Sequence, residues 1–274
     1  MGLRMRLMLL VLLSCAIITG RPGWAEDAGK GQTQVAVEKP SQTPAAMVDQ
    51  RALDILKRMS DTIAQAKTIS FQSRSMVPVK GAHGLWINLF GVSRVVVQGQ
   101  SKLFAETRGD FFPYDFYFDG TTVTAYAPTK NVYAQKEAAG TVEELMDRAY
   151  REEGRTFPYA DILTSDPYAK MTRALTKAVF VGRSTIDGVK TDHLAFANDG
   201  VEWQIWVGEE DHLPRLVSAR YLNDASEPDY TVQFFNWKVN DPATDTDFVF
   251  QNTTNAAKVD FRKPDNAQPY QPQE

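Results

Sequence analysis

The sequence contains a single cysteine, Cys15, and only three histidines among its 274 residues. One cysteine excludes an internal disulfide, and removal of Cys15 with an N-terminal segment would also exclude a thiol nucleophile and a cysteine-ligated zinc. The histidines, His83, His193 and His212, are scattered along the chain, and none has the H-E-x-x-H spacing of a zinc-hydrolase helix. We therefore expect no metal, no cofactor and no catalytic residue.

Motifs for nucleotide binding and for an activated serine are also absent. The sequence has no P-loop, no G-x-G-x-x-G and no G-x-S-x-G. Its formal net charge is −4 and it has no basic run, which argues against nucleic acid as a partner. Asp241, Asp245 and Asp247 form a short acidic cluster, but the glycine and later glutamate of a calcium loop are missing. A hydrolase that uses Asp or Glu is therefore the least favoured function.

The N-terminal residues have the pattern of an export signal. Two arginines precede an apolar run from Leu7 to Ile18, and small residues occupy positions Gly23 and Ala25 before a polar stretch. An apolar run of about 12 residues is shorter than the roughly 20 that span a bilayer, and no later run reaches that length. We predict a signal peptide over residues 1–25, cleavage after Ala25, and a periplasmic mature chain without a transmembrane span.

A second interpretation of this segment concerns Cys15. Leu12-Leu13-Ser14-Cys15 resembles the lipobox of bacterial lipoproteins, in which the cysteine becomes the lipidated first residue. Leu13 is larger than the residue usual at its position, and the apolar run continues past the cysteine. We therefore favour cleavage after Ala25, which removes three arginines and changes the formal charge to −7. The alternative is a membrane-anchored lipoprotein attached through Cys15.

The composition predicts one domain between two polar arms. Residues 26–46 and 262–274 are polar and contain proline, with few apolar residues that could build a core, so we expect a disordered spacer and a disordered tail. About 215 residues lie between them, which is enough for a single domain over 47–261.

Helical patterns occur at the start and in the middle of this domain. Residues 48–66 carry apolar residues at helical spacing, with Asp49 as a candidate N-cap. Thr141 and Glu144 have the spacing of a capping box for a mid-chain helix. Residues 158–163 predict a short helix, and Ser165-Asp166-Pro167 predicts the start of another.

Elsewhere the apolar period is two, which is typical of strands. Three Asp-Gly pairs mark hairpins, and Asp119-Gly120 has the strongest signal for a type I′ turn. The strand at 85–90 is apolar at both alternating sets of positions. Short turns make the sheet antiparallel, and no βαβ alternation occurs. The predicted strands lie at 68–72, 85–90, 103–108, 114–118, 123–125, 131–135, 178–186, 192–197, 202–207, 213–222, 230–237 and 248–250, the last of which closes the sheet.

The pattern resembles two groups of known proteins. The segment from Phe116 to Tyr126, with Asn131-Val132-Tyr133, resembles the strand, Asp-Gly turn and strand of the LolA/LolB lipoprotein-carrier fold. The stretches 51–60, 157–168, 186–196 and 202–206 resemble the domain of unknown function 2092 family of predicted periplasmic proteins. The resemblance implies a mainly β fold with a few helices. Its sheet would be a strongly curved antiparallel half-barrel of about 11 strands, covered by the N-terminal helix and the short mid-chain helices.

This resemblance also implies an apolar concave face that could hold acyl chains, and we expect one alternating set of side chains to line it. The first hypothesis is a non-enzymatic carrier that binds a lipid, a lipoprotein acyl chain or another hydrophobic ligand. The second is a cell-envelope interaction protein with a dry core, which binds an envelope protein partner. The predicted ligand-binding residues are Ile69, Phe71, Leu89, Tyr114, Phe116, Phe118, Trp203 and Ile205.

Overall fold

The structure, a computed structural model, describes residues 47–81, 84–110, 113–153, 160–198, 200–222 and 229–261, except for the side chains of residues 150, 152 and 153. The predicted signal peptide, spacer and tail therefore lie outside the described residues, as does His83. All described residues belong to one unit, Ala46–Glu274. Within this described part, no helix is both long enough and apolar enough to cross a membrane.

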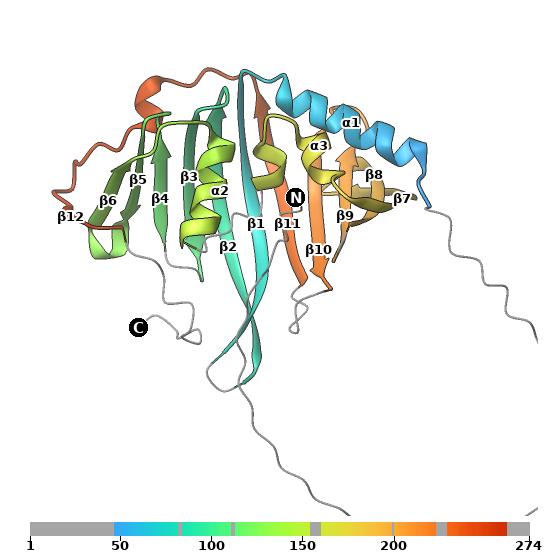
Figure 1. Cartoon of the computed structure of the whole chain (residues 1–274), viewed down its shortest axis with the longest axis horizontal. Coiled ribbons are helices and arrows are strands. Elements are labelled where there is room, and N and C mark those ends of the chain that lie inside the picture. The colour runs from blue at the N-terminus through green and yellow to red at the C-terminus, as the bar shows by residue number, and fades with distance from the viewer. Residues whose placement is uncertain are drawn as a thin grey trace, which may run out of the picture. The chain divides into compact units, whose positions relative to one another are not determined.

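Twelve strands form one open, curved sheet (Figure 1). Their order is β12-β6-β5-β4-β3-β2-β1-β11-β10-β9-β8-β7. All neighbours are antiparallel except β12, which runs parallel to β6. The strands are β1 (Thr68–Lys80), β2 (Trp86–Gln98), β3 (Lys102–Gly109), β4 (Tyr114–Phe118), β5 (Thr122–Ala127), β6 (Val132–Glu137), β7 (Leu175–Ile186), β8 (Val189–Asn198), β9 (Val201–Gly208), β10 (Pro214–Tyr221), β11 (Asp229–Val239) and β12 (Ala257–Val259).

Of the three predicted Asp-Gly hairpins, the one at Asp199-Gly200 lies partly outside the described residues, and the other two have different turns. Asp187 and Gly188 both have positive φ, 47° and 79°, and connect Ile186 to its partner Val189 as a two-residue type I′ turn does. At the other turn only Gly120 has positive φ, and Phe118 pairs with Val123 across a four-residue loop. The prediction of a type I′ turn at Asp119-Gly120 is therefore wrong, although the hairpin is present. Asp119 uses its carboxylate instead, accepting hydrogen bonds from the backbone N–H groups of Thr121 and Thr122 at 2.8 and 2.7 Å.

Three helices, α1 (Gln50–Ala64), α2 (Val142–Glu153) and α3 (Pro167–Met171), cover one face of the sheet, which we call the inner face (Figure 1). The apolar positions of α1 lie three or four residues apart, so they form one stripe that packs on this face. The two predicted caps are present, Asp49 for α1 and the Thr141–Glu144 capping box for α2. The predicted helix start at Ser165-Asp166-Pro167 is also present, and there the Asp166 side chain caps α3. The helices and the inner face share one core cluster.

The opposite face of the sheet, the outer face, is covered near β4–β6 by the C-terminal segment. The prediction of a strand at 248–250 is wrong. Residues Asp245–Phe248 form a 3₁₀ turn, the sheet closes instead at β12, and Phe248 is buried. The Phe250 ring packs against three tyrosine rings, Tyr117, Tyr126 and Tyr133, at centroid distances of 5.7, 5.0 and 5.0 Å. Phe248 and Phe250 therefore cover the outer face of the sheet and do not form a strand within it.

Candidate functional site

The inner face carries all eight residues predicted to line a ligand site. Successive strand residues point to opposite faces, and each of the eight has the parity of a residue buried under the helices. Six of them belong to the core cluster shared with α1: Ile69, Phe71, Phe116, Phe118, Trp203 and Ile205. Tyr114 is half-buried against the cluster. Leu89 is buried but lies outside it, farther along β2. The inner face thus carries a large apolar surface, and helices of the same chain pack against it.

Aromatic side chains that the sequence analysis did not select also lie on this face. The Phe71 ring is 5.5 Å from that of Phe234 and 4.5 Å from that of Trp237. Simple alternation along β11 would place Phe234 and Trp237 on opposite faces. A register shift opposite Ser70–Gln72, with Asn236 at φ 54°, brings both rings inward. Strand periodicity in the sequence cannot reveal this bulge. The one local signal is Asn236, because asparagine adopts positive φ more readily than most residues.

A second aromatic pair lies in the other half of the sheet. The rings of Phe196 and Trp203 are stacked at 4.2 Å, and the Trp203 indole N–H donates to Asn198 Oδ1 at 2.6 Å. The indole polar atom is therefore satisfied while its ring is buried, as a tryptophan in a core requires.

A polar row limits the apolar surface along β1, β2 and β3. Ser73 pairs with Ser93, and Ser93 pairs with Thr107, so the three side chains lie side by side on the inner face. All three are buried, and the Ser93 and Thr107 hydroxyls are 3.0 Å apart. Small hydroxyl side chains reduce the apolar area at this level of the sheet, so the apolar region lies mainly between this row and α1.

A cavity of about 280 Å³ enters the inner face where α1 ends and α2 begins. Of the eight predicted residues, only Ile69 lines it. Its other apolar lining residues are Ile63, Ala64, Ala66, Val97 and Leu163. Its polar lining residues are Gln100, Thr141, Glu143, Thr164 and Ser165. The cavity therefore joins an apolar floor to a polar rim, and it is built from segments far apart in the sequence.

Hydrogen bonds hold the rim in place. Glu143 Oε2 accepts from the Ser165 backbone N–H at 3.3 Å and from its hydroxyl at 3.1 Å, which ties the start of α2 to the turn before α3. Lys170 Nζ lies 4.0 Å from Glu143 Oε1 and 3.6 Å from Asp147 Oδ1. The rim thus presents amide, hydroxyl and carboxylate groups, which can hydrogen-bond to a polar headgroup.

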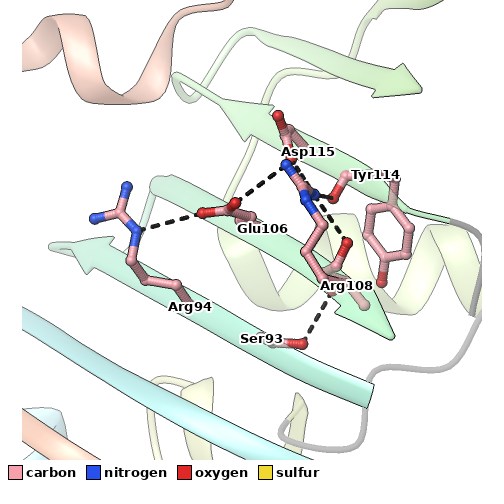
Figure 2. A network of polar contacts seen from close by, with 7 residues as sticks. Ser93, Arg94, Glu106, Arg108, Tyr114 and Asp115 are labelled. Atoms are coloured by element: carbon pink, nitrogen blue, oxygen red, sulfur yellow. Dashed lines mark hydrogen bonds and ion pairs between the residues drawn. The ribbon is translucent and has the colours of Figure 1, made fainter. Parts of the chain in front are cut away.

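Arg94, Glu106, Arg108 and Asp115 form a polar network on the outer face of β2–β4 (Figure 2). The Arg108 guanidinium donates to Asp115 Oδ1 at 2.7 Å and contacts Glu106 at 3.1 Å, and Arg94 lies 3.7 Å from Glu106. Burial alone would lower the pKa of Arg108, but Asp115 and Glu106 outweigh it and raise that pKa. Every charge in this network is paired, so it holds three strands together and offers no reactive group.

Metal binding has no support in the part of the chain that the structure describes. Within it, no group of three or more His, Cys, Asp or Glu side chains is placed to hold a metal ion. His193 is stacked on Trp206 at 4.0 Å and its Nε2 is 2.8 Å from Gln204 Oε1. His212 lies in the β9–β10 turn with positive φ.

Comparison with known protein families gives one match. A family model described as "Predicted periplasmic protein (DUF2092)" matches residues 52–262. No curated protein sequence matches the chain.

Several solved structures have a similar fold at low identity. Lipoprotein LppX of Mycobacterium tuberculosis is 14% identical, with a TM-score of 0.36 over 72% of this chain and 98% of LppX. The matched chain of the MucA/MucB complex of Pseudomonas aeruginosa is 14% identical, with a TM-score of 0.41 over 74% of this chain and 62% of the matched chain. A putative outer membrane lipoprotein-sorting protein domain of Vibrio parahaemolyticus is 8% identical, with a TM-score of 0.35 over 73% of this chain and 96% of the matched chain. The predicted mainly β fold, with one curved sheet covered by helices, is confirmed by the twelve-stranded sheet of the structure itself.

Proposed function

Because the chain belongs to the DUF2092 family of predicted periplasmic proteins, as its sequence predicts, we propose that it is an exported, non-enzymatic carrier of an amphiphilic lipid. The apolar chain of the ligand enters the inner face beneath the helices, and its polar headgroup stays at the rim. The proposal includes removal of the signal peptide after Ala25. Lipidation of Cys15 is the alternative, which would make the protein a membrane-held acceptor.

The observation that carries this proposal is the cavity beside Ile69. Its floor is continuous with the apolar inner face, while its rim carries Gln100, Thr141, Glu143 and Ser165. Such a division between apolar and polar walls matches the two ends of an amphiphile. Each methylene buried there contributes about 0.8 kcal/mol. A cavity of about 280 Å³ holds only part of a long acyl chain, so binding requires α2 and α3 to move from the inner face.

The test is to purify the full chain from a bacterial envelope and to identify retained lipids by native mass spectrometry. A hydrophobic fluorophore is then titrated, and lipids should displace it from one saturable site. Ala66→Trp places bulk in the cavity and should weaken fluorophore binding about tenfold. Ala169→Trp, on the exposed side of α3, is the matched control and should bind as the parent does. The proposal is abandoned if no lipid is retained and no saturable site exists.

The packing of the inner face favours a second function, a cell-envelope interaction protein with a dry core. Six of the eight predicted residues are buried together with α1, and Phe118 and Ile205 are 0% exposed. Under this alternative, Ala66→Trp changes no binding property, and an envelope protein rather than a lipid is retained on purification. The two functions therefore give opposite results in the same experiment.

A further inference from the structure

The hairpin formed by β1 and β2 extends beyond the rest of the sheet (Figure 1). The register of β1 with β11 ends at Met76, and that of β2 with β3 ends at Gly91. Beyond those points β1 and β2 continue to pair with each other, from Val77–Leu89 to Lys80–Trp86. Four residue pairs at strand spacing correspond to about 14 Å of projecting hairpin. The sequence analysis predicted only short strands in this region.

The projecting part carries apolar side chains on both of its faces. One face carries Val77, Val79, Ile87 and Leu89, and the other carries Pro78 and Trp86 beside Lys80 and Asn88, with Met76 and Phe90 at its base. Leu85 and Trp86 are 69% and 52% exposed, and Met76, Ile87 and Phe90 are exposed as well. Five of the twelve exposed large apolar residues in the described part of the chain therefore lie on this hairpin. Exposed apolar residues gathered in this way mark a binding surface rather than a core.

The charge of this segment differs from that of the whole chain. Residues 77–90 contain one lysine, one histidine and no acidic residue, while the whole chain has a formal net charge of −4. The one lysine, Lys80, is exposed and pairs across the hairpin with Trp86. A tryptophan beside a cationic side chain is typical of the interface between a bilayer and water. A segment without carboxylates can also approach an anionic lipid surface without repulsion.

From these observations we propose that the tip of the β1–β2 hairpin docks the protein on the surface of an anionic lipid bilayer. A narrow projection cannot bury the broad, complementary area of a stable protein interface, but it can enter the headgroup region of a bilayer. The hairpin can enter the bilayer only to a limited depth, because the outward backbone groups of a two-stranded hairpin lack partners and cannot enter hydrocarbon. Pro78 reduces this cost, since it has no N–H. The docking does not depend on the cavity or its ligand.

Vesicle binding tests the docking with the mature chain from residue 26 onward, which lacks Cys15, Trp24 and the apolar run from Leu7 to Ile18, so that neither an acyl anchor nor the signal peptide contributes. Vesicles of phosphatidylglycerol and phosphatidylethanolamine should sediment the parent protein. The double variant Leu85→Ser/Trp86→Ser should bind at least about tenfold more weakly, because it removes the two most exposed apolar side chains of the tip. Val181→Ser/Leu222→Ser removes two exposed apolar side chains, from β7 and from the turn after β10, and should bind as the parent does.

The depth of Trp86 gives a second readout. Brominated lipids should quench the tryptophan fluorescence of the parent protein on vesicles. Trp86→Phe should keep most of the binding and lose most of this quenching, since the other described tryptophans lie in β9 and β11. The proposal is overturned if the parent does not sediment, or if the Leu85→Ser/Trp86→Ser variant sediments equally well. It is also overturned if that variant dissociates a dimer seen in the parent, which would make a second copy the occupant.

This test is separable from that of the carrier function. Leu85→Ser/Trp86→Ser should leave fluorophore binding in the cavity unchanged, whereas Ala66→Trp should leave vesicle binding unchanged. Circular dichroism and thermal unfolding of each variant establish that the fold is retained.

Discussion

The carboxylate of Asp49 joins the start of α1 to the backbone of Phe180 at the edge of the sheet. Its Oδ1 accepts from the Arg51 backbone N–H at 2.9 Å, and its Oδ2 accepts from the Phe180 N–H at 3.3 Å. The Asp49 N–H in turn donates to the Ala178 carbonyl at 2.8 Å, and the Ala178 N–H donates to Met47. One residue thus caps a helix and occupies hydrogen-bonding groups of β7, an edge strand that would otherwise be open to pairing with another chain.

Asp49→Ala should therefore lower the free energy of unfolding by about 1–2 kcal/mol, since it removes an N-cap and leaves the Phe180 N–H without its carboxylate. Urea denaturation measures the loss, and amide hydrogen exchange should show faster exchange at Phe180. Asp54→Ala, on the same helix, removes only an exposed bond from Gln50 and should cost less than about 0.5 kcal/mol. Equal losses for the two variants would contradict the bridging role.

Asp119 should make stability depend on pH in the acid range. Partial burial alone would raise the pKa of its carboxyl, but hydrogen bonds from Thr121 and Thr122 outweigh burial and hold that pKa below its ordinary value. A carboxyl whose pKa is lower when folded stabilises the protein above the unfolded pKa of about 3.9, and this contribution is lost as the pH falls through the folded pKa.

Asp119→Asn should thus flatten the decline in stability below a pH of about 4, and it should be less stable than the parent at neutral pH. Thermal unfolding between pH 2 and pH 7 measures both effects. Asp260→Asn, at an exposed carboxylate, serves as the control and should follow the parent curve. Parallel curves for Asp119→Asn and the parent would show that this carboxylate does not contribute.

Phe250→Ala tests the cover on the outer face. The substitution removes ring contacts with Tyr117, Tyr126 and Tyr133. Because Phe250 is only partly buried, we expect a loss of about 2 kcal/mol, below the value for a fully buried phenylalanine. Limited proteolysis should then cut the segment 240–261 sooner. The neighbouring Val249→Ala, at an exposed residue, should leave the cutting rate unchanged.

Two isoleucines of the same sheet face should respond very differently to truncation. Ile205 is 0% exposed under the helices, whereas Ile87 is 39% exposed on the projecting hairpin. Ile205→Ala should cost about 3 kcal/mol, from lost burial and the cavity that remains. Ile87→Ala should cost about 0.5 kcal/mol. Chemical denaturation measures both, and a similar loss at the two positions would mean that the hairpin packs against the domain in solution.

Local signals in the sequence predicted the elements that depend on local chemistry. Asp49 and the Thr141–Glu144 box cap the helices that they were expected to cap, and α3 begins where Ser165-Asp166-Pro167 predicted a helix start. Alternation along β4 and β9 also placed the selected residues of each strand on a single face of the sheet. These features involve hydrogen bonds or side-chain directions within a few residues, so the sequence pattern is sufficient to find them.

Features that depend on distant partners could not be predicted. The long β1–β2 hairpin was missed because Ser73, Arg74 and Pro78 interrupt the apolar alternation. Ser73 is accepted because it aligns with another hydroxyl residue on the inner face, and Pro78 because the described structure places no third strand beside it. The polar rim of the cavity combines the β2–β3 turn, the start of α2 and the turn before α3, and only the folded chain brings these segments together.

The pairing of β1 with β11 determines when this protein can finish folding. Ile69 pairs with Val239, which lies near the end of the domain. The centre of the sheet therefore cannot form until nearly the whole domain has been synthesised. Loop closure over such a separation slows folding, whereas the hairpins from β1 to β6 can form as they emerge. The apolar stripe of α1 also packs near β7, β8 and β9, which come late in the chain. Under the export that we propose, the chain would therefore remain incompletely folded until its last strands have crossed the membrane.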